Sequence, residues 1–225
     1  MQSYAAGSHG SWFSSVGQVS RAGFLLPLLA IDLVFIGGHL LRWGEAWRLD
    51  LDGGWGERWG YVKEAAIAVA LLVVYRRSRQ PIYAAWAAVF AYVLADDALM
   101  LHERGGKALA RLFDFQPMFG LRFNDWGELL VSAVAGSLLL AVSWLAFQRS
   151  DATARWDSKI LLGLFVVLVF FGVVVDMAHI ALASAGFHVR MLVLEDGGEL
   201  LALSLTAAYA FHLMRQPVAV SGRQR

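Results

Sequence analysis

Acidic and histidine side chains recur inside apolar stretches of this sequence, at spacings that place them on shared helical faces. Asp176 and His179 lie at positions i and i+3, and Glu195 and Glu199 at i and i+4, so each pair projects from one side of a helix. Helix bundles hold carboxylate-bridged metals with an acid and a histidine one turn apart, facing carboxylates on neighbouring helices. The spacing therefore predicts a shared site for a metal ion.

The predicted metal site draws its ligands from the ends of three apolar runs. Carboxylate oxygens and imidazole nitrogens suit Zn, Mn or Fe, and a metal held by them can activate a water molecule. No catalytic residue is assigned beyond the metal ligands. The expected ligands are Asp97, His102, Glu103, Asp176, His179, Glu195 and Glu199.

Several of these acids have a simpler explanation. Acids in the first turn of a helix are stabilised by the helix dipole, which accounts for Asp125, Glu128, Glu195 and Asp196 without any ligand. Asp97, Asp176 and His179 lie deeper in apolar sequence, where ionisable groups usually face a bundle interior or a water-filled cavity. These three residues carry the functional hypothesis. A haem ligated by His102 and His179 is an alternative to the divalent metal.

The composition indicates a membrane protein. Of the 225 residues, 58% are hydrophobic and 16% are charged, whereas a soluble domain carries about 25% charged residues. The chain contains no cysteine, which excludes disulfides and thiolate metal sites. A net charge of +1 does not give the basic charge excess that is typical of proteins that bind nucleic acids. The expected partner is the lipid bilayer.

The elements that would position the site are six apolar runs. About 20 apolar residues cross the roughly 30 Å hydrocarbon core, and open sheets cannot satisfy their backbone there. We therefore expect an all-α integral membrane bundle of about six transmembrane helices over residues 21–215. A flexible N-terminal tail (1–20) and a cytoplasmic tail (216–225) would flank it. The runs cover about 22–41, 61–75, 81–103, 126–147, 159–184 and 191–214.

The orientation follows from basic residues in short loops. Arg76, Arg77 and Arg79 separate the second and third runs, and Arg149 and Arg155 lie in the next loop on the same side. The positive-inside rule places these loops and both termini on the cytoplasmic side of the membrane.

The acids segregate under this topology. Of the 18 acids, only Asp151 and Asp157 fall on the cytoplasmic side. Asp32 and His39, seven residues apart on the first run, are placed together in its outer half. The predicted site therefore lies near the periplasmic face.

Three motifs resemble a known family. They are Asp96–Asp97 with Leu101–His102–Glu103, then Asp176–Met177–Ala178–His179, then Glu195–Asp196–Gly197–Gly198–Glu199 followed by Ser204. Together they resemble a family of small bacterial multi-pass membrane proteins with no established function. The resemblance extends from Asp32 to Tyr209. It implies the topology, the inner membrane of a bacterium and the candidate residues, but no reaction.

A fainter likeness is to the alkaline-ceramidase type of membrane hydrolase. Members of that superfamily have seven helices and bind zinc through several histidines, with an Asp and a Ser nearby. This sequence has six predicted helices and lacks their paired-histidine motif, so no residue is carried over.

Three functions remain open from the sequence. The first is a metal-dependent membrane enzyme, such as a hydrolase. The second is a cation or proton-coupled transporter with the same acids as its cation site. The third is a non-catalytic assembly subunit, in which the acids pair with Arg104, Lys107, Arg122 and Arg190. Ser132 and Ser204 are interpreted as packing residues.

Overall fold

The computed structural model describes residues 23–182 and 188–217, and the elements within these ranges are helical. The predicted tail 1–20 and most of the predicted tail 216–225 lie outside them. The α-helices are α2 (Leu25–Leu40), α3 (Trp55–Ser78), α4 (Pro81–Leu99), α5 (Leu101–Leu112), α6 (Phe123–Gln148), α7 (Ala152–Val169), α8 (Asp176–Ala181) and α9 (His188–Arg215). A 3-10 turn, η1 (Glu45–Trp47), follows α2, and a π-helix, η2 (Phe170–Val175), joins α7 to α8. The all-α prediction is confirmed.

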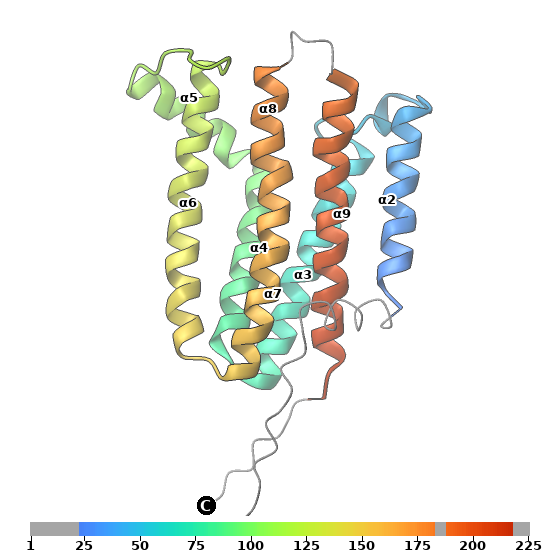
Figure 1. The fold of residues 1–225 in the computed structure, drawn as a ribbon, viewed down its shortest axis with the longest axis vertical. Helices are drawn as coiled ribbons and strands as arrows, with labels where there is room; N and C mark the ends of the chain where they lie inside the picture. The colour runs from blue at the N-terminus through green and yellow to red at the C-terminus, as the bar shows by residue number, and fades with distance from the viewer. Residues whose placement is uncertain (1–22, 183–187, 218–225) are drawn as a thin grey trace, which may run out of the picture.

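The long helices lie side by side and alternate in direction (Figure 1). α3 packs against both α4 and α9, which places it at the centre of the bundle. The main apolar core fills the space among α3, α4, α7 and α9, with Ile67, Phe90, Leu161 and Ala207 fully buried. The described chain begins and ends at the same end of the bundle (Figure 1).

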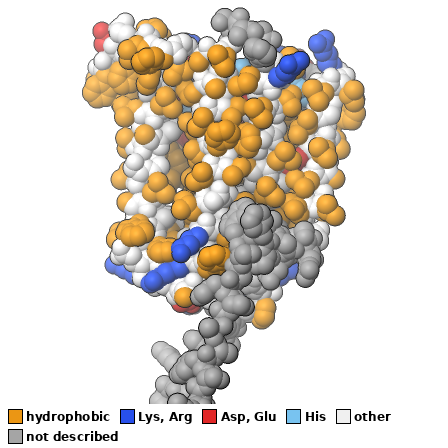
Figure 2. Space-filling view, in the orientation of Figure 1, with side chains coloured by type: hydrophobic (Ala, Val, Ile, Leu, Met, Phe, Trp, Pro, Cys, Tyr) orange, Lys and Arg blue, Asp and Glu red, His pale blue; other side chains and the backbone are white. Residues whose placement is uncertain are grey.

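Three helical segments are long and apolar enough to cross a membrane: α4, α6, and the continuous stretch Ala152–Ala181. α2 is apolar but has 16 residues. Hydrophobic side chains also cover much of the side of the bundle (Figure 2), including Leu138 and Trp144 on α6, which are 64% and 60% exposed. A surface of this kind indicates membrane association.

The third predicted helix differs from the structure at its C-terminal end. One helix was expected over 81–103, but α4 ends at Leu99 and α5 begins at Leu101. Met100 between them has a left-handed backbone, with φ of 51°. α5 is strongly amphipathic, with Arg104, Lys107 and Arg111 among its residues, so it does not continue an apolar span. The sequence carries no Gly or Pro at this break, which explains why the prediction missed it.

The second and fifth predicted runs were too short at their N-terminal ends. α3 begins at Trp55 rather than residue 61, because the more polar residues 55–60 continue the helix. α7 begins at Ala152 rather than 159, and its N-cap is Asp151, whose side chain accepts a 2.8 Å hydrogen bond from the backbone N–H of Ala154. The other three runs match α2, α6 and α9 to within a few residues.

Candidate functional site

A polar cavity of about 540 Å³ lies at the end of the bundle where α3 and α9 begin and α4 ends. We call it the acidic cavity. Its lining comes from α3, α4, α5, α6, η2, α8 and α9, and from the loop before α3. Eleven of its lining residues are acids, against two cationic residues, Lys107 and Arg122. The acids are Asp50, Asp52, Glu57, Glu64, Asp97, Glu103, Glu128, Asp176, Glu195, Asp196 and Glu199.

All seven predicted metal ligands line this cavity. They come from four helices. Asp97 lies in the last turn of α4, and His102 and Glu103 lie in the first turn of α5. Asp176 and His179 are on α8, and Glu195 and Glu199 are on α9. Asp176 and His179, and Glu195 and Glu199, were paired by their helical spacing, and both pairs line this one cavity. Their role as ligands stays a prediction. The seven are Asp97, His102, Glu103, Asp176, His179, Glu195 and Glu199.

Both histidines of the cavity pair with a carboxylate through Nδ1. His102 Nδ1 lies 3.0 Å from Asp96 Oδ2, and His179 Nδ1 lies 2.6 Å from Glu195 Oε2. The hydrogen bond to Asp96 raises the pKa of His102 above its usual value. In metal sites a histidine typically bonds a carboxylate through one ring nitrogen, which fixes the ring and makes the other nitrogen a better ligand. Both pairs have this arrangement.

Within the described residues, one group brings its potential ligand atoms within 4.8 Å of one another, namely Asp96, Asp97 and His102. Asp96 was absent from the predicted ligand set. Its Oδ1 also accepts a 2.8 Å hydrogen bond from the backbone N–H of His102. Since both oxygens of Asp96 bind His102, we interpret Asp96 as the residue that positions this histidine. The break at Met100 makes this contact, because it turns the start of α5 back onto the end of α4.

The π-helix η2 places Gly172 directly beside Glu199. A β-carbon at Gly172 would lie 2.7 Å from Glu199 Oε1, so glycine leaves the space that this carboxylate occupies. Single-turn π-helices inside α-helices are frequent at functional sites. This one immediately precedes Asp176, and its wider turn sets the register of Asp176 and His179 relative to α7.

Glu64 is a buried carboxyl group that lies beside another acid. Its side chain lines the acidic cavity, the residue is 2% exposed, and no N–H group of the described residues donates to its Oε2. Its hydrogen-bond partner is the side chain of Asp97, which requires a proton on one of the two carboxyls. Two adjacent buried carboxyls are stabilised by a proton that they share or by a cation between them, because like charges this close do not both ionise. The Glu64–Asp97 pair is therefore a place in the cavity where a bound cation can replace a proton.

The rim of the cavity contains ion pairs that are at least partly exposed. Lys107 Nζ lies 2.9 Å from Glu103 Oε2, and Arg122 bonds Asp125 at the start of α6 through its side chain and its backbone N–H. These were two of the four cations named as partners in the assembly-subunit hypothesis. Lys107 binds an acid on its own helix and Arg122 binds one in the first turn of α6, so their hydrogen bonds do not go to the deeper carboxylates of the cavity.

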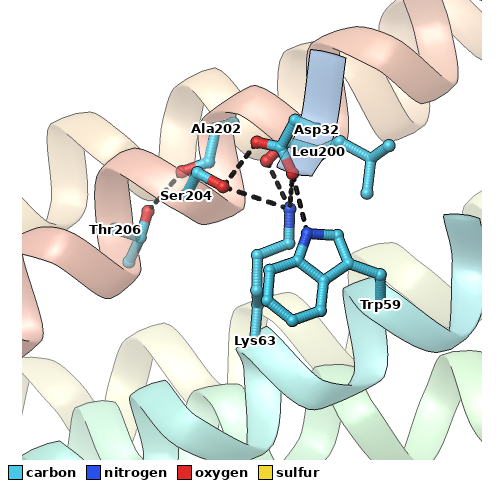
Figure 3. Close-up of polar contacts among 7 residues, drawn as sticks. All are labelled: Asp32, Trp59, Lys63, Leu200, Ala202, Ser204 and Thr206. Carbon is cyan, nitrogen blue, oxygen red and sulfur yellow. Dashed lines mark hydrogen bonds and ion pairs between the residues drawn. The ribbon is translucent and has the colours of Figure 1, made fainter. Parts of the chain in front are cut away.

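A second polar cluster lies deeper, between α2, α3 and α9 (Figure 3). Lys63 Nζ is 2.9 Å from Asp32 Oδ1 and donates to the carbonyl oxygen of Leu200 at 2.7 Å. Ser204 Oγ donates to Asp32 Oδ2 at 2.5 Å, and Trp59 Nε1 donates to Asp32 Oδ1 at 2.8 Å. Asp32 and Ser204 are 0% exposed and Lys63 is 1% exposed. We call these residues the Lys63 cluster.

The Lys63 cluster was missed from the sequence. Asp32 and His39 were expected to act together, but Asp32 binds Lys63, while His39 Nδ1 accepts a hydrogen bond from the backbone N–H of Leu49. The interpretation of Ser204 as a packing residue is incomplete, because its hydroxyl bonds Asp32. Asp32 and Ser204 were noticed in the sequence, but the signal for their partner was Lys63, a single lysine inside an apolar run.

Asp157 forms a third polar contact near the opposite end of the bundle. Its carboxylate accepts hydrogen bonds from Tyr83 at 2.6 Å and from Tyr209 at 2.9 Å. Nearby, Trp86 Nε1 donates to Ser158 Oγ at 2.9 Å. These bonds join α4, α7 and α9 at the end away from the acidic cavity.

The comparisons with known proteins identify a family but no activity. No curated protein and no solved structure matches the chain. A family model described as a domain of unknown function, DUF8692, matches residues 58–213, a span that runs from the start of α3 to the end of α9 and holds all seven predicted ligands. The likeness to alkaline-ceramidase-type hydrolases stays a prediction. The chain belongs to the DUF8692 family.

Proposed function

We propose that this protein is a metal-dependent membrane hydrolase whose acidic cavity holds a divalent Zn, Mn or Fe ion. The observation that carries the proposal is that seven acids and histidines on four helices line one cavity, beside the buried carboxyl pair of Glu64 and Asp97. A divalent ion would replace the proton of that pair and offset part of the excess of carboxylates. It would also lower the pKa of a bound water to about 7, which supplies a nucleophile at neutral pH.

The proposal includes a membrane topology of six spans: α2, α3, α4, α6, the α7–α8 stretch and α9. α3 and α9 have 24 and 28 residues, which correspond to roughly 36 and 42 Å at 1.5 Å per residue. Charged residues on α3 such as Lys63 and Glu64 are buried, so they need not meet lipid. Under the positive-inside rule, Arg76, Arg77 and Arg149 place both termini in the cytoplasm of the bacterial inner membrane and the cavity at the periplasmic face.

A transporter is the less favoured alternative. Transport needs a polar path through the bundle, with sites near the midplane. Beyond the Lys63 cluster the centre of the bundle is filled by Ile67, Leu71 and Phe90, each 0% exposed. A flux of divalent cations into proteoliposomes that is lost in Asp176→Asn would favour the transporter.

The test is metal analysis of the full chain purified in detergent. We expect about one equivalent of Zn, Mn or Fe, removed by chelation and restored by titration. Asp97→Asn and Glu199→Gln should each weaken binding by at least tenfold, a cost of about 1.4 kcal/mol. Asp114→Asn is the matched control, because Asp114 is exposed and does not line the cavity. A wild-type protein that neither retains nor binds a stoichiometric metal would overturn the proposal.

A further inference from the structure

A second cavity continues from the acidic cavity along the length of the bundle. It has a volume of about 320 Å³ and lies between α4, α6 and the stretch from α7 to α8. The two cavities share lining residues at the carboxylate end, including Asp97, His102, Glu128 and Glu199. We call the second cavity the groove. A ligand that fills both would therefore have one end among carboxylates and the other in the groove.

Away from the shared carboxylates, the groove is mainly apolar. Its walls are formed by side chains such as Val89 on α4, and Phe165, Leu168 and Val173 on the facing stretch. The acidic cavity has the opposite character. The pair of cavities thus matches an amphiphile, whose polar end and hydrocarbon chain need different surroundings.

The groove exists because one face of α6 carries small side chains. Ser132, Gly136 and Ser143 line it, together with Leu139, at the i, i+4, i+7 and i+11 spacing of a single helical face. A β-carbon placed on Gly136 would meet no atom within 4 Å, so the space beside it is open. From Glu128 to Ser143 the groove follows α6 for roughly 22 Å at 1.5 Å per residue. One leaflet of the hydrocarbon core is about 15 Å thick, so the groove can hold an acyl chain.

The arrangement of α6 gives the groove a side that faces the membrane. α6 packs against α4 and α5 but stands apart from α7 along most of its length (Figure 1). Its outer flank is apolar and exposed, with Leu140 and Val142 at 52% and 56% exposure. Leu140 also lines the groove. A hydrocarbon chain can therefore pass between the bilayer and the groove without crossing water.

We propose that the substrate is a membrane amphiphile with a cationic or zwitterionic head, held with its head in the acidic cavity and its hydrocarbon chain in the groove. The preference for this head follows from the kind of group in the lining, where carboxyls outnumber the cations Lys107 and Arg122 by eleven to two. Ionised carboxylates attract a cationic head, and protonated carboxyls lack the positive charge that would hold an anion, so an anionic head is disfavoured. This inference names the substrate class of the proposed hydrolase and rests on that function, but binding in the groove can be measured without metal.

The test uses fluorescence quenching of Trp86, which lines the groove. The probe is an undecyl chain with bromine at one end and trimethylammonium at the other, added to chelator-treated protein in detergent. We expect the tryptophan fluorescence to be quenched saturably. The part of this quenching that disappears in Trp86→Phe, which we call the Trp86 component, reports the groove. The same chain ending in a carboxylate should bind more weakly, on the order of tenfold, because its head faces like charges.

Two variants separate the groove from the rest of the bundle. Gly136→Phe fills the groove and should weaken the Trp86 component roughly tenfold or more. Gly37→Phe is the matched control, because a β-carbon at Gly37 on α2 also meets nothing within 4 Å and Gly37 does not line the groove. Ser132→Leu is a second groove variant, and the thermal unfolding of each variant in detergent establishes that it is folded.

The outcomes distinguish the substrate class from the metal chemistry. Quenching that is lost in Gly136→Phe and kept in Gly37→Phe supports the amphiphile. Equal quenching in all folded variants, or preference for the anionic chain, overturns it. Gly136→Phe leaves the carboxylates intact and should keep its metal, so absence of metal from every variant would count against the hydrolase alone.

Discussion

Lys63 and Glu64 are neighbours on α3, yet they belong to polar regions with opposite properties. Lys63 donates to Asp32, Leu200 and Ser204, and the Asp32 carboxylate receives further hydrogen bonds, so the Lys63 cluster is balanced in charge and saturated with bonds. Glu64 faces the acidic cavity, where its side chain pairs with another acid, Asp97, and no N–H group donates to its Oε2. A buried polar region that satisfies itself acts in folding, whereas one with surplus acceptors requires a ligand.

The same contrast appears in how the two regions join the helices. The Lys63 cluster links α2, α3 and α9 through Asp32, Lys63 and Ser204, whose side chains are almost fully buried (Figure 3). The acidic cavity is lined by more elements, but its cations bind acids at the rim. Substitutions in the first region should therefore change stability, and substitutions in the second should change ligand binding.

The largest expected effect is on stability, from Lys63→Met. This change leaves the Asp32 carboxylate buried without its cation, which should cost about 3–5 kcal/mol of unfolding free energy. Lys107→Met is the matched control, because the same substitution there breaks the partly exposed pair with Glu103, worth about 0–1 kcal/mol. Thermal unfolding in detergent measures both. Equal destabilisation by the two variants would remove the distinction between the regions.

A smaller effect is expected on metal binding, from Asp96→Asn. Loss of a carboxylate that orients a metal-binding histidine typically lowers metal affinity by about 10–100-fold. Asp96→Glu should recover part of that loss, since it keeps the charge. Metal titration of the chelated protein gives the affinity. If Asp96→Asn lowers the unfolding temperature but leaves the affinity unchanged, Asp96 is only a cap of α5.

The smallest effect is expected from Gly172→Ala. The added methyl would lie 2.7 Å from Glu199 Oε1, and this end of a flexible side chain can move aside. We expect a loss of metal affinity of about tenfold or less and little change in unfolding temperature. Gly136→Ala adds the same methyl where nothing lies within 4 Å and is the control. An unfolding temperature that falls sharply in Gly172→Ala would indicate that the glycine serves packing instead.

Helical spacing predicted the surface of the acidic cavity because it depends on local geometry. Asp176 with His179, and Glu195 with Glu199, lie on shared faces in any regular helix, and both pairs line the cavity. Apolar runs likewise gave the long helices. The helix break at Met100 was missed, because a left-handed methionine leaves no mark in the sequence.

Features that depend on how helices meet were outside the reach of the sequence. Lys63 pairs with Asp32, which is 31 residues away, and nothing local to either residue identifies its partner. The groove depends on Ser132 and Gly136 facing larger side chains of α4 and α7, which requires the relative rotation of three helices. Asp96 was omitted as a functional residue because its contact with His102 depends on the turn at Met100.

The contact between α5 and α6 leaves no room for a β-carbon. At Gly127 such an atom would lie 2.1 Å from the carbonyl oxygen of Gly106, and at Gly106 it would lie 2.6 Å from the backbone nitrogen of Glu128. Neither position can accept another amino acid without separating the two helices. Both lie within the span shared by the DUF8692 family. When other members are aligned, these two glycines should remain unchanged, and they provide a fixed reference from which the register of α5 on α6 can be assigned in each protein.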